Sequence, residues 1–193
     1  MEYNFKENQK FAAVSGPGGW NDPDMLEIGN GGMTVEEEKT HFALWAIAKA
    51  PLIIGCDLTT LRPESLAILT NARLIAVNQD PASRQATCRV NCDSMDEFLR
   101  RPQVYATKTG DGATVATVVN WREMNHGNFA FRLGELGVVS GPTDNVRVQD
   151  LWTGETVARI DRSVQSDLLT LADIPGHGNW TLKITIESLV YDL

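Results

Sequence analysis

Residues 18–27 read Gly-Gly-Trp-Asn-Asp-Pro-Asp-Met-Leu-Glu and form the densest cluster of chemically versatile side chains in the sequence. Asp22 and Asp24 are two positions apart, so both would point to one face of a regular strand, although Pro23 and the nearby glycines make regularity doubtful. Paired carboxylates can serve as acid and base in glycoside hydrolysis, ligate a hard metal ion, or cap a turn. The spacing alone leaves these roles open.

The segments around this cluster alternate between helical and extended patterns. Residues 1–13 are predicted to end a helix, and Thr34-Val35-Glu36-Glu37 has the spacing of a capping box that starts a helix running to about Lys49. Residues 52–56 are a short apolar run typical of a parallel strand covered on both faces. Another helix is predicted over residues 63–77, with proline in its first turn. This order is that of βα repeats, and two such units cannot close a barrel, so we expect them to complete a larger domain.

The pattern changes near residue 84 to short runs of Val, Thr and aromatic residues separated by turn signals. Gly110-Asp111-Gly112 is typical of a hairpin turn. The expected strands are residues 104–107, 113–119, 129–131, 146–148, 168–171 and 180–186. This second half is therefore predicted to be an all-β domain, most simply a sandwich.

The charge balance argues against one class of partner. The chain has 17 Lys and Arg against 25 Asp and Glu, a net charge of −8, and no basic cluster, so it would repel the phosphates of nucleic acid. A neutral sugar suffers no such penalty. No apolar run approaches the length that spans a membrane, so no membrane partner is expected. The three histidines and three cysteines lack metal-ligand spacing, and we expect no metal or cofactor.

The cysteines and one sequon bear on covalent modification. Cys88 and Cys92 are close enough to close a small loop and are expected to form a disulfide, whereas Cys56 lies in an apolar run and is expected to be a buried thiol. Asn179-Trp180-Thr181 is a glycosylation sequon, so Asn179 is a candidate glycan site.

Several other polar and aromatic residues are expected to have structural roles. His41 is interpreted as a packed side chain of the helix. The run Glu36-Glu37-Glu38 is an acidic first helical turn, favoured by the helix dipole. Three tryptophans of the second half are expected in the core, with a sugar-stacking platform as the alternative; they are Trp121, Trp152 and Trp180.

Residues 16–81 resemble family 27 glycoside hydrolases, the α-galactosidases (melibiases) and α-N-acetylgalactosaminidases. The resemblance rests on Gly18–Leu26, Gly29–Thr34, Phe42–Ile47, Lys49–Leu58 and Ile75–Pro81, in that order and without an evident gap. The β-rich half is similar to the carboxyl-terminal antiparallel domain of this family in position and length, with a fungal-like style.

The resemblance implies a chain of two parts. Residues 1–83 would be the carboxyl-terminal part of a (β/α)8 catalytic barrel, and residues 84–193 an antiparallel β-sandwich. Asp24 would hydrogen-bond galactose hydroxyls and Met25 would line the pocket wall. Three other motif residues would be scaffolding; they are Trp20, Asn21 and Asp22. Asp22 and Asp24 would therefore not be the acid/base pair.

The implied activity is that of a secreted retaining α-galactosidase that releases terminal α-linked galactose from oligosaccharides without a cofactor. In the family, the nucleophilic and acid/base aspartates lie on earlier barrel strands, so this chain is expected to contain no catalytic residue and to be inactive alone. An α-N-acetylgalactosaminidase is the near alternative. A noncatalytic carbohydrate-binding or structural module is the alternative of another class.

Overall fold

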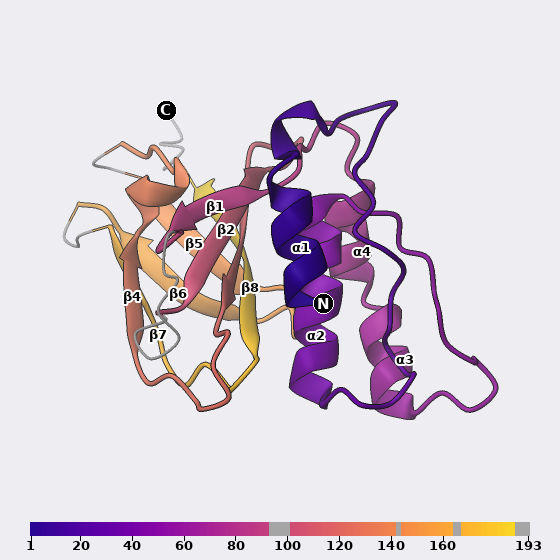
Figure 1. The fold of residues 1–193 in the computed structure, drawn as a ribbon. Coiled ribbons are helices and arrows are strands. Elements are labelled where there is room, and N and C mark those ends of the chain that lie inside the picture. The colour runs from indigo at the N-terminus through magenta and orange to yellow at the C-terminus, as the bar shows by residue number, and fades with distance from the viewer. Residues whose placement is uncertain (93–100, 142–143, 164–166, 188–193) are drawn as a thin grey trace.

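The computed structural model describes residues 1–92, 101–141, 144–163 and 167–187, with the helices on one side and the strands on the other (Figure 1). The helices are α1 (Glu2–Gln9), the 3-10 helix η1 (Ala12–Val14), α2 (Val35–Ala48), α3 (Pro63–Leu69) and α4 (Ala72–Gln79), and the short 3-10 helix η2 (Leu133–Leu136) lies among the strands. The strands are β1 (Thr87–Val90), β2 (Gln103–Lys108), β3 (Thr114–Val119), β4 (Phe129–Arg132), β5 (Asn145–Asp150), β6 (Thr156–Asp161), β7 (Leu168–Leu171) and β8 (Asn179–Glu187).

Local capping signals explain where the helices begin and end. Thr34 and Glu37 form the predicted capping box of α2, and Lys49 ends that helix in the left-handed conformation. The helix predicted over residues 63–77 is instead two helices. Asn71 breaks it, because its side-chain oxygen caps α4 by accepting hydrogen bonds from the next helical N–H groups.

The apolar run at residues 52–56 is parallel to the segment around Leu26 but forms a single bridge, Leu26 to Ile54, rather than the predicted strand. The Leu26 N–H donates to the Ile53 carbonyl at 2.8 Å, and the Gly55 N–H donates to the Leu26 carbonyl at 3.0 Å. The run is not covered on both faces, since Ile53 and Ile54 are 54% and 45% exposed. Only one neighbouring extended segment pairs with it among the described residues, so part of its surface stays open.

Two antiparallel sheets form the sandwich. The larger sheet has the strand order β1-β2-β3-β8-β5-β6, and β4 pairs with β7 in the smaller one. Alternate side chains of the larger sheet point toward Phe131 and Leu169 of the smaller sheet; they include Val104, Ala106, Ala116, Val118, Val146, Val148, Leu182 and Ile184. The predicted strands and sandwich are confirmed. The sequence prediction missed β1 and β6, which lie at the two edges of the larger sheet.

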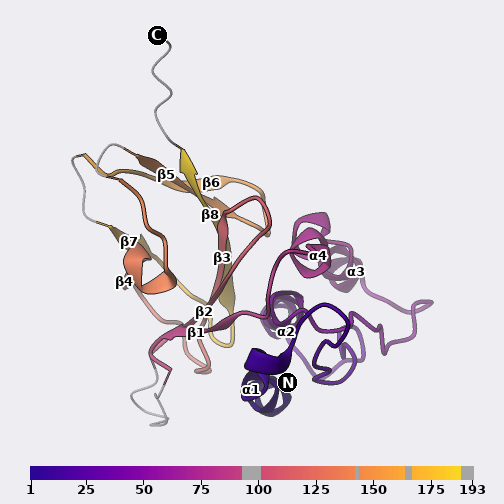
Figure 2. The same cartoon turned by 90° about the horizontal axis from the view of Figure 1, so that it is seen from above.

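The opposite face of the larger sheet packs against α2 and α1, so the molecule has a helical layer, a large sheet and a small sheet (Figure 2). Phe5 and Trp45 share one hydrophobic cluster with Tyr105, Val115 and Trp121. Because this cluster spans the predicted boundary at residues 83 and 84, the two parts share a core. The boundary itself stays a prediction.

The disulfide Cys88–Cys92 is present, as predicted. Cys56 is a free thiol but is half-buried rather than buried. None of the helices in the described ranges is long and apolar enough to cross a lipid bilayer.

Candidate functional site

Side-chain contacts anchor the beginning of the motif segment to the surrounding helices. The Asn21 amide donates to the Phe11 carbonyl at 2.9 Å and to the Gln85 side chain at 3.1 Å. The Lys49 ammonium lies 5.3 Å from the centroid of the Trp20 ring, in cation–π geometry. These contacts are of the kind expected for scaffolding at Trp20 and Asn21.

Lys49 is itself buried between the ends of α2 and α4. Its ammonium donates to the Val77 carbonyl at 3.1 Å and to the Asp80 carbonyl at 2.6 Å. Burial lowers the pKa of Lys49, and the charge of Asp80 opposes that shift. The ammonium therefore joins the two helix ends next to the Trp20 ring.

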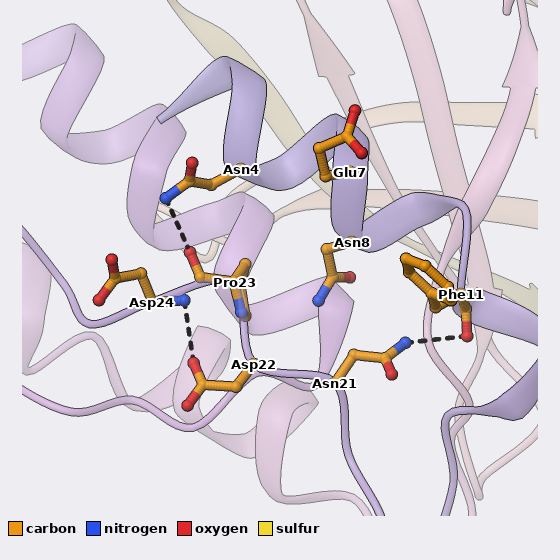
Figure 3. Close-up of a pocket in the computed structure, with 8 residues that line it drawn as sticks. All are labelled: Asn4, Glu7, Asn8, Phe11, Asn21, Asp22, Pro23 and Asp24. Atoms are coloured by element: carbon orange, nitrogen blue, oxygen red, sulfur yellow. Dashed lines mark hydrogen bonds between the residues drawn. The ribbon is translucent and has the colours of Figure 1, made fainter.

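The two motif carboxylates are exposed, and each accepts one backbone hydrogen bond. Asp22 accepts a hydrogen bond from the Asp24 N–H at 2.9 Å and so caps the turn. Asp24 accepts one from the Met25 N–H at 2.8 Å through Oδ1, while Oδ2 accepts none from the described residues. Figure 3 shows both side chains extending to the same side of the segment, away from Asn8 and Phe11. The exposed Asp24 carboxylate is thus available to a ligand.

A groove of about 560 Å³ lies between α1 and this segment. It is lined by Asn4, Glu7, Asn8, Phe11, Asn21, Asp22, Pro23 and Asp24 (Figure 3). Met25 is 46% exposed but does not line the groove. A Cβ atom at Gly55 would lie 3.1 Å from Met25 Sδ, so Met25 lies over the glycine of the neighbouring run. The structure therefore places Asp24 at the groove and Met25 beside it.

Asn179 lies at the start of β8, where the sheet meets α2, and is only 7% exposed. Its amide nitrogen donates to Thr40 Oγ1 at 3.0 Å, and its oxygen accepts hydrogen bonds from Trp152 and Thr181. A glycan attached to this nitrogen would need space that the packed interface does not provide. The geometry thus argues against the sequon being used in the folded chain.

The tryptophans of the second half do not share one exposed surface. Trp121 is buried and donates to Gln103 at 2.7 Å. Trp152 packs against the cluster between α2 and the sheet, whereas Trp180 packs against the core of the sandwich. These positions favour the packing interpretation over a sugar-stacking platform.

Sequence reasoning missed the role of Glu38, which it interpreted only as part of an acidic first helical turn favoured by the helix dipole. Its side chain is fully buried and accepts hydrogen bonds from the Gly29 N–H at 3.1 Å, Arg62 at 3.0 Å and Ser65 at 2.7 Å. Glu38 therefore joins the loop after the motif to α3. No local signal distinguishes it from Glu36, which pairs with Lys39 at the surface.

Comparison with known proteins agrees with this arrangement. The family model described as Alpha galactosidase A matches residues 1–80, and the one described as Alpha galactosidase C-terminal beta sandwich domain matches residues 100–184. The chain belongs to the α-galactosidase family. Its two matched regions correspond to the helical part with the motif and to the sandwich, so the expected family and fold class are confirmed.

Relatives in this family come from plants and fungi. Alpha-galactosidase 3 of Arabidopsis thaliana is 64% identical over 148 residues, 76% of this chain and 32% of that protein. The probable alpha-galactosidase D of Aspergillus niger is 37% identical over 177 residues, 89% of this chain and 24% of that protein. The crystal structure of alpha-galactosidase I from Mortierella vinacea superimposes with a TM-score of 0.78 at 28% identity, over 96% of this chain and 44% of that one.

The chain covers part of the length of these relatives, which are plant and fungal proteins. The chain spans about a third or less of the curated α-galactosidases described above. Plant and fungal proteins both match, so the likeness does not single out the fungal style expected for the β-rich half.

Proposed function

We propose that this chain supplies one wall of the galactose-binding pocket of an α-galactosidase, and that the whole enzyme hydrolyses terminal α-linked galactose with retention. Asp24 would accept hydrogen bonds from sugar hydroxyls, and Met25 would contact the apolar side of the ring. Membership in the α-galactosidase family supports the reaction, and the exposure of both side chains supports their roles.

The open oxygen of Asp24 is the observation that carries this proposal. Asp22 and Asp24 each accept one backbone N–H through Oδ1 and each keep Oδ2 without a hydrogen bond among the described residues, but it is Asp24 that is followed directly by the exposed Met25. A hydrogen bond from a hydroxyl to such a charged acceptor contributes about 1.5–3 kcal/mol. This is enough to orient a sugar but supplies neither nucleophile nor proton donor, so we propose that the isolated chain does not turn over substrate.

The activity can be tested in a chimera that joins this chain to the preceding part of alpha-galactosidase 3 from Arabidopsis thaliana, a 64% identical relative. The chimera should hydrolyse nitrophenyl α-galactoside, whereas the isolated chain should not. A preference of the chimera for nitrophenyl α-N-acetylgalactosaminide would favour the alternative specificity.

Two variants test the site within this chimera. Asp24→Asn should lower kcat/KM by about 10- to 100-fold, the equivalent of a lost charged hydrogen bond. Asparagine tolerates the positive φ at this position, so the backbone should be kept. Asp161→Asn is the control, because Asp161 is an exposed carboxylate at the end of β6 that caps a turn. Equal kcat/KM in both variants would refute the pocket assignment.

We also propose that the parent enzyme is secreted. The disulfide Cys88–Cys92 supports an oxidising compartment, in which such bonds form and persist. The experiment is to follow the enzyme in its host, where we expect it in the medium and with the cysteines paired.

A further inference from the structure

One face of α2 meets the backbone of the motif segment at two points. Trp45 Nε1 donates to the Asp24 carbonyl at 2.7 Å, and His41 Nε2 accepts from the Glu27 N–H at 3.2 Å. The two side chains are four residues apart on the helix, so they lie on the same face. Both are 1% exposed, and their ring centroids are 4.1 Å apart. The contacts bracket Met25 from both sides in sequence.

The backbone of this segment needs external support. Asp24 has a φ of 88°, in the left-handed region that residues other than glycine rarely adopt. Such a conformation costs on the order of 1–3 kcal/mol and persists only when its surroundings enforce it. The bridge to Ile54 fixes Leu26, and the Asn4 amide donates to the Pro23 carbonyl at 3.2 Å. Trp45 holds the segment between these two anchors, and His41 holds it directly after Leu26.

The imidazole of His41 is suited to accept a hydrogen bond. Because Nε2 faces an N–H donor, the ring proton must lie on Nδ1, which has no hydrogen-bond partner in the described ranges. Burial lowers the pKa of His41 to about 4, with a smaller effect of the amino terminus. The ring is therefore neutral near pH 7 and keeps its lone pair toward Glu27.

We propose that His41 and Trp45 are positioning residues for the sugar-binding segment. Together they hold the backbone from Asp24 to Glu27, so that the Asp24 carboxylate and the Met25 side chain project in fixed directions. The inference rests on the proposed function, because it assigns these two residues to the placement of Asp24 against galactose.

Three variants separate the hydrogen bonds from packing. Trp45→Phe keeps an aromatic ring and removes the N–H donor. His41→Leu removes the acceptor, whereas His41→Gln restores an acceptor oxygen near the position of Nε2. Trp152→Phe is a matched control, since it removes an indole hydrogen bond to Asn179, away from the motif.

The experiment follows amide hydrogen exchange and chemical shifts by NMR on the 15N-labelled chain, and kcat/KM for nitrophenyl α-galactoside in the chimera described above. In His41→Leu the Glu27 amide should exchange about fivefold faster or more, the effect of losing one hydrogen bond. Trp45→Phe should shift the Asp24 and Met25 amides. In the chimera, both variants should lower kcat/KM by about fivefold, while His41→Gln and Trp152→Phe stay close to the wild type.

The two readouts distinguish the two ideas. If Asp24→Asn leaves the kcat/KM of the chimera unchanged, the proposed role of Asp24 fails, and hydrogen exchange still tests the positioning role. The positioning role is overturned if Glu27 exchange and the Asp24 shifts are unchanged in folded variants, or if His41→Gln is as damaged as His41→Leu. Should Trp45→Phe fail to fold, the pair of His41 variants decides.

Discussion

Replacing Glu38 should destabilise the chain far more than replacing its neighbour Glu36. The Glu38 carboxylate is fully buried and receives three donors, from the Gly29 backbone, the Arg62 guanidinium and the Ser65 hydroxyl. Glu38→Ala would leave the Gly29 and Ser65 donors without a partner and a cavity beside them. Each buried donor that loses its acceptor costs about 1–3 kcal/mol, whereas Arg62, whose side chain is 51% exposed, keeps its contact with water.

A second variant separates charge from shape. Glu38→Gln keeps the volume; its amide oxygen can accept from Gly29 and Arg62, as Glu38 Oε1 does, and its NH2 group can donate to the Ser65 hydroxyl, which can also accept. Only the negative charge is then lost, so we expect a loss of about 1 kcal/mol, the difference between a charged and a neutral acceptor. Glu36→Gln is the matched control, because the Glu36–Lys39 pair at 2.8 Å lies at the surface and such pairs contribute about 0.5 kcal/mol.

Urea unfolding of the four proteins, followed by tryptophan fluorescence and circular dichroism, measures these differences. The midpoints should fall in the order wild type and Glu36→Gln, then Glu38→Gln, then Glu38→Ala, with similar slopes. A Glu38→Ala free energy of unfolding within about 1 kcal/mol of the wild type would show that the buried network is not formed or not needed.

Further predictions concern pH, the shared core and the sequon. Burial holds the pKa of His41 at about 4, below its usual 6.5, so the unfolded chain binds a proton that the folded chain excludes between these values. The contribution of His41 to the free energy of unfolding is complete above pH 6.5 and is lost on acidification. From pH 7 to pH 4, the free energy of unfolding measured in urea should therefore fall by about 3 kcal/mol more in the wild type than in His41→Gln. Because helices cover the sheet face with Tyr105 and Trp121, the whole chain should unfold in one transition, and two separate transitions would contradict this. Residues 84–193 alone should be less stable than the whole chain or should self-associate, as measured by ultracentrifugation. Chain made in a secretory host should keep its mass after N-glycosidase treatment, since Asn179 is packed against α2, and a glycan on folded protein would refute that packing.

Local patterns were sufficient for most elements of this fold. The capping box at Thr34 and the proline at the start of α3 act within one helical turn, so they are readable from neighbouring residues. The alternation of apolar and polar residues in β8 likewise reflects its own two faces, and the apolar run of β3 reflects burial on both faces. β6 was missed because it is an edge strand, whose exposed positions carry polar residues and weaken the apolar signal.

The sequence by itself determined the family, most of the helices and strands, and the motif that presents Asp24, because these depend on short-range spacing and on residues in a recognisable order. Only the tertiary structure decided that Glu38 is buried, that Asn179 is enclosed, and that His41 and Trp45 support the motif backbone. Each of these depends on partners that are distant along the chain or on another element, as with Asn179 and Thr40, which are 139 residues apart. Burial and hydrogen bonding of a side chain are properties of the packed neighbours, and no local pattern encodes which neighbours folding will bring together.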